Sequence, residues 1–360
     1  MRIILKISKI WIPVFLFALV LAGCGDPDKN AGTGNPTGPL SPPTVVSVVP
    51  AGGATGICQG AIVTATFSKA MNPSTIDTGT FKLAAGAAAV TGTVALDSTD
   101  TIATFTPSSP LAVNTPYTGT ITTGAKDQFG NALAANFVWM FTTASTACPG
   151  PIALGSACTF GILAATPSVT NTGATHVTGD VGIWPAASIT GFPPGTLTGT
   201  EHTGDAVAQT AQGDLTTAYN AAAGAPGGAA LTADIGGQTL PPGVYKATST
   251  LGITGNLTLD GSTNPNGTWI FQIGSALTTA AGAPGVPASQ VLLIGGAQAH
   301  NVIWETGSAA TLGTYSLFQG TIMAQTSITL GTGATLNGRA LARTGAVTLD
   351  TNPVNVPPCP

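Results

Sequence analysis

The C-terminal half of the chain repeats with a period near 18 residues, and this period restricts the possible fold more than any other feature. A first column of threonines consists of Thr278, Thr311, Thr329 and Thr348. Each lies eight or nine residues after the start of an apolar segment, and the last two steps between them are 18 and 19 residues. Three strands of about four residues and three short turns complete one circuit of this length. The period therefore predicts a three-sided β-solenoid.

Two further threonine columns accompany the first. The second consists of Thr306, Thr326 and Thr344, and the third of Thr314, Thr332 and Thr351. Stacked strands lie about 4.8 Å apart and alternate residues of one strand about 6.7 Å apart, so such columns would form a flat grid of hydroxyl and methyl groups. Threonine is also a good strand former and its ladders hydrogen-bond across strands. Spacing alone therefore favours a structural role.

One helix is expected within this β pattern, from residue 205 to about residue 223. Apolar residues recur there at three- and four-residue steps, and Gly224 follows as a stop signal. The single apolar face predicts a helix lying along the side of the β structure. The residues of that face are Val207, Ala211, Leu215, Ala218 and Ala222. The expected solenoid interior consists of Phe160, Ile162, Ile270, Phe271, Ile303, Phe318, Ile322 and Leu341.

Residues 44–144 show a different pattern. Apolar and polar residues alternate in short segments, separated by Pro, Gly and Asn at intervals of roughly ten residues, as in a β-sandwich of about 100 residues. We expect about seven strands here, followed by a connector at residues 144–151 and the solenoid at residues 152–360. The segment holds no His and no acidic cluster, and we assign it no chemistry.

Charged residues are scarce throughout. The chain has 10 Lys+Arg and 14 Asp+Glu, 7% charged, against roughly 25% in an ordinary soluble protein. Nucleic-acid binding requires clustered Lys and Arg on the phosphates, so the composition excludes nucleic acid as a partner. With 43% hydrophobic residues, the chain can nevertheless build cores.

The N-terminus carries an export signal. Arg2, Lys6 and Lys9 precede an apolar run at residues 10–22, which is too short to span a bilayer of about 30 Å. The run ends in Leu-Ala-Gly-Cys and resembles a bacterial lipobox, which implies removal of residues 1–23 and lipidation of Cys24. Since Gly25 is not Asp, the resemblance implies anchoring at the outer membrane or cell surface. An ordinary signal peptide is the alternative. Residues 24–43 are rich in Gly and Pro and predict a flexible stalk.

Four further cysteines remain if Cys24 is lipidated. Outside the cytoplasm they can pair, and four cysteines permit three connectivities. None has the C-x-x-C spacing of a zinc or redox site. We favour Cys58 with Cys148 and Cys158 with Cys359, because each bond would tie the beginning of a domain to its end.

Two groups of sequence phrases resemble known families. TFSKAMN (66–72), KDQFGNAL (126–133) and WMFTT (139–143) are similar to the bacterial Ig-like domain of surface proteins, which usually acts as a spacer. The C-terminal half resembles the microbial ice-binding protein family over about 200 residues. The phrases that carry this second resemblance are TGDVG (178–182), LPPGVY (240–245), TWIFQI (268–273), LIGGAQAHNVIW (293–304), FQGTIMA (318–324) and LNGRALA (336–342).

The second resemblance implies a mainly β fold: a discontinuous, right-handed, triangular β-solenoid with one long helix alongside. It also implies adsorption to ice through one flat face, which in that family commonly bears Thr-Ala/Gly-x-Thr/Asn patterns. Residues 326–329 and 344–348 lie where that face is expected but depart from the pattern, whereas residues 172–175 and 332–335 match it. The predicted ice-binding residues are Thr172, Thr175, Thr278, Thr306, Thr311, Thr326, Ser327, Thr329, Thr344 and Thr348.

Such a surface needs no nucleophile, metal or cofactor, and we expect a monomer whose partner is the ice surface and whose only link to a membrane is Cys24. Threonine suits this role because it offers one hydroxyl and one methyl on a side chain with few rotamers. A polysaccharide-degrading enzyme is one alternative. It is disfavoured because the acidic residues do not recur on one coil column and the histidines, His176, His202 and His300, are scattered.

A surface adhesin or spacer is the second alternative. Glycan binding would use exposed aromatic residues, for which Trp184, Trp269, Trp304 and Tyr315 are candidates, although Trp269 and Trp304 are expected in the core. Arg339 and Arg343 are the only arginines after residue 23, and we assign neither a functional role.

Overall fold

The computed structural model describes residues 41–359 of the chain. The predicted signal peptide, Cys24 and most of the predicted stalk lie outside these residues. Within them, none of the helices has the length and apolar character needed to cross a membrane.

The N-terminal part is an antiparallel β-sandwich, as predicted. One sheet has the strand order β1-β2-β6-β5 and the other β4-β3-β7-β8. The strands number eight, against about seven expected, and the additional short one is β4. Their bounds are β1 (Val45–Val49), β2 (Val63–Phe67), β3 (Phe81–Ala85), β4 (Ala88–Ala89), β5 (Gly92–Leu96), β6 (Ile102–Pro107), β7 (Pro116–Ile121) and β8 (Phe137–Thr142), with a short 3-10 helix, η1 (Pro73–Thr75).

Alternation along these strands builds the sandwich core. In β2, Val63, Ala65 and Phe67 are buried while the residues between them are half-buried. Phe81 contacts Phe105 and Trp139 with ring centroids 5.7 and 6.0 Å apart. The two sheets therefore share an aromatic centre of the kind that dominates core energetics.

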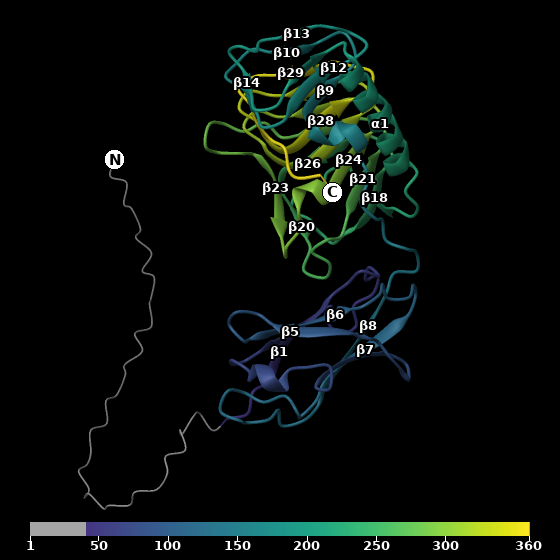
Figure 1. Ribbon diagram of the computed structural model, residues 1–360, viewed down its shortest axis with the longest axis vertical. Helices are drawn as coiled ribbons and strands as arrows, with labels where there is room; N and C mark the ends of the chain where they lie inside the picture. The colour runs from purple at the N-terminus through teal and green to yellow at the C-terminus, as the bar shows by residue number, and fades with distance from the viewer. Residues whose placement is uncertain (1–40, 360) are drawn as a thin grey trace, which may run out of the picture. The chain divides into compact units, whose positions relative to one another are not determined.

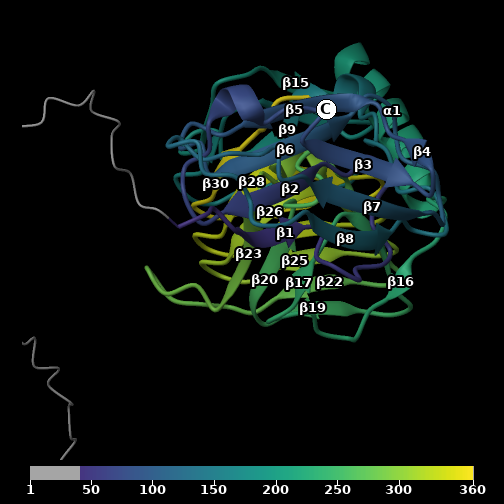
Figure 2. The same ribbon diagram turned by 90° about the horizontal axis from the view of Figure 1, so that it is seen from below.

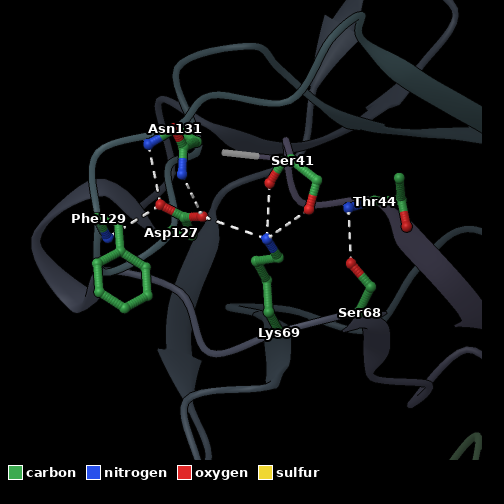
Figure 3. Close-up of polar contacts among 7 residues, drawn as sticks. All are labelled: Ser41, Thr44, Ser68, Lys69, Asp127, Phe129 and Asn131. Atoms are coloured by element: carbon green, nitrogen blue, oxygen red, sulfur yellow. Dashed lines mark hydrogen bonds and ion pairs between the residues drawn. The ribbon is translucent and has the colours of Figure 1, made fainter. Parts of the chain in front are cut away.

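A buried carboxylate fixes the turn that contains the KDQFGNAL phrase (Figure 3). Asp127 accepts hydrogen bonds of 2.9 Å from the backbone N–H groups of Phe129 and Asn131 and from the Asn131 side chain, and Lys69 Nζ lies 3.7 Å from its Oδ2. Burial raises the pKa of Asp127, but these hydrogen bonds and the charge of Lys69 outweigh it, so the pKa lies below its usual value. The phrase thus serves a structural turn.

The C-terminal part is a β-solenoid of parallel strands with one helix (Figure 1). It begins with η2 (Gly155–Thr159), β9 (Phe160–Ala164), β10 (Val169–Asn171), β11 (His176–Val177), β12 (Asp180–Ile183), β13 (Ile189–Thr190), β14 (Thr196–Leu197), β15 (Glu201–Thr203) and α1 (Ala206–Ala223). It continues with β16 (Ala229–Ala230), β17 (Thr239–Leu240), β18 (Gly243–Ala247), β19 (Leu251–Ile253), β20 (Gly255–Asp260), β21 (Trp269–Ile273), β22 (Leu277–Thr279) and β23 (Ser289–Ile294). It ends with η3 (Ala299–Asn301), β24 (Val302–Thr306), β25 (Ala310–Leu312), β26 (Leu317–Ala324), β27 (Ile328–Leu330), β28 (Thr335–Ala342), β29 (Val347–Leu349) and β30 (Pro353–Asn355).

The solenoid has three faces. The threonine face is a seven-stranded sheet with the order β13-β10-β29-β27-β25-β22-β19. The helix-covered face contains β15, β12, β9, β24, β21, β18 and β16, and the third face contains β14, β11, β30, β23, β20 and β17. The long strands β26 and β28 contribute to both of these last two faces: Leu336 and Asn337 of β28 pair with β30, whereas Ala340 and Leu341 pair with β9.

The stack is discontinuous in sequence. On the threonine face, β29 pairs with β27 on one side and with β10 on the other, although β10 lies about 180 residues earlier in the chain. The first coils therefore stack on the last coil, and the later coils begin at the opposite end. The helix α1 lies between these two groups of coils in the sequence.

The helix α1 packs along one side of the stack, as predicted (Figures 1 and 2). Its 18 residues span about 27 Å, which matches five or six strand spacings of about 4.8 Å. The buried side of α1 includes Ala211, Leu215 and Ala222, which pack on the helix-covered face. Gln272 of β21 donates to the carbonyls of Ala222, Ala223 and Ala225 and so satisfies the C-terminal end of the helix.

The expected interior residues are all buried, but they occupy two cores. Ile162, Phe271, Phe318 and Ile322 fill the coil interior together with Trp269 and Trp304. Phe160, Ile270, Ile303 and Leu341 lie instead on the outer side of the helix-covered face, beneath α1 and η2. Neighbouring residues of a strand point to opposite sides, so adjacent apolar residues necessarily divide between the two cores.

Both predicted disulfides are present. Cys58 bonds to Cys148 with Cα atoms 5.5 Å apart, and Cys158 bonds to Cys359 with Cα atoms 5.7 Å apart. Beside the second bond, the fully buried Arg339 donates to the carbonyls of Cys158 at 2.7 Å and Pro357 at 2.6 Å. Burial lowers the pKa of Arg339 to about 10. The C-terminal segment is thereby tied to the start of the solenoid.

Candidate functional site

A ladder of six threonines runs across the threonine face. In each three-residue strand the outer two residues point inward and the central residue points outward, as the burial of β22, β25 and β29 shows. The central residues pair directly across neighbouring strands. In spatial order they are Thr190, Thr170, Thr348, Thr329, Thr311, Thr278 and finally Gly252. The six threonines span about 24 Å at the usual strand spacing.

A second column of small residues runs beside the ladder, two residues earlier on each coil. Its members are joined by successive backbone hydrogen bonds of neighbouring strands, from 2.9 to 3.2 Å, so they share one register. Neither column contains a charged or long side chain. The second column consists of Ser188, Ser168, Ala346, Ser327, Ala309, Ala276 and Thr250.

The hydroxyls in the middle of the ladder are available to solvent molecules. Thr311, Thr329 and Thr348 donate no side-chain hydrogen bond within residues 41–359, and Thr311 and Thr348 are exposed. Nearer the ends, Thr170 is 3.0 Å from the Ser168 hydroxyl, and Thr278 contacts the Leu251 carbonyl at 3.5 Å. Packed inward neighbours hold each strand flat, so the ladder offers fixed hydroxyl and methyl groups at a regular spacing.

One carboxylate lies at the border of this face. Asp350 follows β29 and accepts hydrogen bonds from the hydroxyls of Thr332 at 2.6 Å and Thr351 at 3.0 Å. These hydrogen bonds hold the pKa of Asp350 below its usual value, and the bond from Thr332 has the largest effect. Asp350 is thus an ionised group at the edge of the ladder rather than within it.

The first predicted column lies in this ladder. Thr278, Thr311, Thr329 and Thr348 are register partners, and Ser327 stands in the second column. Thr326 and Thr344 are exposed in the turns that lead into β27 and β29, and Thr172 is exposed two residues after Thr170.

Two predicted site residues are wrong because they are buried. Thr306 is fully buried and donates to the Ser308 carbonyl at 3.1 Å, and Thr175 is 1% exposed and donates to Asn171 Oδ1 at 2.6 Å. The predicted second column aligned Thr306 with Thr326, whereas the structure pairs Thr306 with Ala324. This offset of two residues assigned Thr306 to the turn before the threonine face, although it is the last residue of β24 on the helix-covered face.

Two members of the ladder, Thr170 and Thr190, are absent from the predicted set. Both belong to the coils that precede α1, where the 18-residue period is absent. The signal that identifies them is a small residue two positions before the threonine, in Ser168-Val169-Thr170 and Ser188-Ile189-Thr190. The same spacing occurs in Ser327-Ile328-Thr329 of the predicted set.

Titratable groups gather elsewhere, beneath α1. Glu305 is 6% exposed. Burial raises the pKa of Glu305 and outweighs the opposing effects of a hydrogen bond with Tyr219 and of the positive charge of Arg343. Burial is the main cause that raises the pKa of Tyr219, and the neighbouring Glu305 raises it further. Among residues 41–359 no group of three or more His, Cys, Asp or Glu side chains is placed to hold a metal ion.

Parallel coils, a helix against one face and an uncovered ladder of small residues on another define a helix-flanked β-solenoid. Residues 162–355, more than half of the chain, match the ice-binding-like family, and the chain belongs to that family. Residues 40–143 match the bacterial Ig-like domain family.

Individual relatives agree with this assignment. An ice-binding protein of Nostoc sp. (strain HG1) is 48% identical over 204 residues, which is 56% of this chain and 73% of the relative. An ice-binding protein of Flavobacterium frigoris (strain PS1) is 41% identical over 222 residues, covering 57% of this chain and 76% of the relative. The crystal structure of an ice-binding protein from an Antarctic biological consortium superposes with a TM-score of 0.54 at 50% identity, covering 57% of this chain and 91% of that one.

Proposed function

We propose that this protein binds ice and that the threonine face is the surface that adsorbs to the crystal. The observation that carries the proposal is the register of six outward threonines on a sheet that no other element of residues 41–359 covers. The names of its relatives support the same activity. The proposed consequence is inhibition of ice growth or recrystallisation, or attachment of the cell to ice.

The chemistry of the face suits this role. Each threonine hydroxyl anchors one water, and the adjacent methyl restricts the arrangement of neighbouring waters. Because β-branching leaves few rotamers, little side-chain entropy is lost when the water layer orders. The mechanism uses position and rigidity and involves no catalytic residue.

Measurement of thermal hysteresis and ice-crystal shape with the full chain tests the proposal. Thr311→Tyr places a bulky group in the middle of the ladder and should remove most of the hysteresis. Thr198→Tyr is the matched control, because Thr198 is exposed after β14 on the third face. Loss of hysteresis in both variants, or in neither, would show that the threonine face is not the ice-binding surface.

We also propose that the protein is anchored at the cell surface through a lipid on Cys24. The charged and apolar order of residues 1–23 before Cys24 supports this proposal, and the Ig-like domain is consistent with a spacer role. Cys24→Ser should abolish incorporation of labelled palmitate and release the protein from membranes. Unchanged membrane association in that variant would overturn the anchor while leaving ice binding untouched.

A further inference from the structure

A pocket of about 350 Å³ lies beside α1, separate from the threonine ladder. The helix contributes one wall, the end of β12 contributes a second, and the residue that follows β28 contributes a third. Its size is at the lower end of the range for small-molecule sites. Its lining consists of Trp184, Pro185, Gln209, Gln212, Gly213, Thr216 and Arg343.

Trp184 gives this pocket an accessible aromatic surface. Among the tryptophans of residues 41–359, Trp184 alone is half-buried. The others, Trp139, Trp269 and Trp304, are buried in the cores. Its indole N–H donates no hydrogen bond within that part of the chain. A tryptophan with a free polar edge and a partly open ring suits a ligand with one apolar face.

Arg343 provides a fixed positive charge. Its guanidinium carbon lies 4.4 Å from the centroid of the Tyr219 ring, and its Nη1 donates to Gln325 Oε1 at 2.5 Å. Its Nη2 makes no hydrogen bond within the described residues. Its charge also acts on the buried Glu305, but that carboxyl lies outside the pocket lining, which includes no acidic side chain. The guanidinium is therefore oriented in advance and suited to an anionic group.

The helix supplies amide groups to the same pocket. Gln212 is 6% exposed, and its Nε2 donates to the carbonyls of Ala164 at 2.8 Å and Ala342 at 3.1 Å. Both donors of that amide are thus occupied, which leaves its Oε1 as an acceptor. The side chain of Gln209, one turn earlier, is exposed and makes no hydrogen bond within residues 41–359.

We propose that this pocket binds one hexuronate unit of an acidic polysaccharide. The apolar face of the pyranose ring lies on Trp184, its carboxylate pairs with Arg343, and its hydroxyls bond to Gln209 and Gln212. The lining contains no residue of the threonine ladder, so the protein can hold a glycan and an ice surface through different parts of the solenoid. A single unit of this size should bind with a dissociation constant on the order of 1 mM.

Calorimetric titration of the full chain with trigalacturonate tests the proposal. We expect saturable binding that weakens at least about tenfold, or 1.4 kcal/mol, in Trp184→Ala. Trp184→Phe retains a stacking ring and should retain most of the affinity, which separates loss of stacking from loss of fold. The trimer with methyl-esterified carboxyl groups should bind the native chain more weakly, and Arg343→Gln should abolish that preference.

Lys246→Gln is the matched charge control. It removes one positive charge from the neighbouring hollow at the other end of α1, which Arg343 does not line, and should leave trigalacturonate binding unchanged. An equal loss in Lys246→Gln and Arg343→Gln would indicate general charge attraction and overturn the site. Absence of saturable binding, or unchanged binding in Trp184→Ala, would also overturn it. Thermal hysteresis of the same variants is expected to stay at the native level, so either proposal can fail without the other.

Discussion

At the scale of single residues, the direction of a threonine decides whether it can contact ice. Thr306 and Thr311 are five residues apart on one coil, yet Thr306 is fully buried and Thr311 is exposed. Thr306 ends β24 on the helix-covered face, whereas Thr311 is the central residue of β25 on the threonine face. Identical side chains therefore have different roles, which depend on the face of the solenoid and the side of the strand on which each one lies.

A pair of isosteric substitutions tests this distinction. Thr306→Val removes a hydroxyl whose only hydrogen bond within residues 41–359 is to the Ser308 carbonyl. It should therefore leave thermal hysteresis unchanged and lower the free energy of unfolding by about 1 kcal/mol. Thr311→Val removes an unpaired surface hydroxyl and should lower hysteresis with little effect on unfolding. Loss of hysteresis in Thr306→Val with an unaltered unfolding curve would contradict the facing assignment.

The buried Glu305 makes stability depend on pH. Burial raises the pKa of Glu305 in the folded state. The protonated carboxyl therefore favours folding at pH values below its pKa in the unfolded chain. This contribution to stability is lost as the pH rises through its pKa in the folded protein. Glu305→Gln should therefore raise the urea midpoint at pH 8, and the gain should shrink as pH falls toward 4.

The control for this prediction is Glu201→Gln, which removes the same charge from an exposed position. It should show no such pH-dependent gain in the urea midpoint. A gain in Glu305→Gln that is equal at pH 4 and pH 8 would mean that titration of Glu305 does not contribute.

At the scale of elements, α1 covers one face of the solenoid and leaves the threonine face open. Its helical period was readable from the sequence, and so was its place beside the β structure. Its orientation was less accurately predicted: Val207 was expected on the apolar face but is 47% exposed, and Ala208 is buried instead. A run of alanines has apolar residues on several sides, so periodicity alone does not fix which side is buried.

Truncation of one helix side chain measures how strongly α1 is held. Leu215 is fully buried between α1 and the helix-covered face, and Leu215→Ala should cost about 2–5 kcal/mol in unfolding free energy. Val207→Ala on the same helix should cost much less, because its side chain is largely exposed. Similar losses from the two substitutions would place Val207, not Leu215 alone, in the packed interface.

The period of the coils revealed four members of the ladder but not Thr170 and Thr190. The last coils follow one another in sequence, so the step from Thr311 to Thr329 is visible as a repeat. The coils before α1 join the stack only in space, where Thr170 pairs with Thr348. A period along the sequence cannot indicate that pairing. The resemblance to a family with a discontinuous solenoid, by contrast, correctly predicted the fold.

At the scale of the whole molecule, each of the two folded parts has its own core and its own disulfide. Cys58–Cys148 joins residues that flank most of the sandwich, and Cys158–Cys359 joins the first coil to the C-terminal segment across 201 residues. Each bond closes a long loop, which constrains the unfolded chain most strongly.

Removing the disulfides one at a time should separate their effects. Replacing Cys158 and Cys359 by Ala should lower the unfolding free energy of the solenoid by about 2–5 kcal/mol. The fluorescence of the buried Trp269 and Trp304 reports this transition. Replacing Cys58 and Cys148 should affect mainly the transition of the sandwich, which contains Trp139. An unchanged solenoid transition without Cys158–Cys359 would mean that the rest of the stack suffices to hold the C-terminal segment.

The pairing of β10 with β29 also governs the order in which the molecule can be assembled. Thr170 and Thr348 are separated by almost half of the chain, so Thr170 cannot pair with its neighbour on β29 until nearly the whole chain has been synthesised. Contacts between such distant residues slow folding, because a long loop must close before they form. A chain halted before its last thirty residues would therefore possess every early coil and still lack a continuous threonine surface.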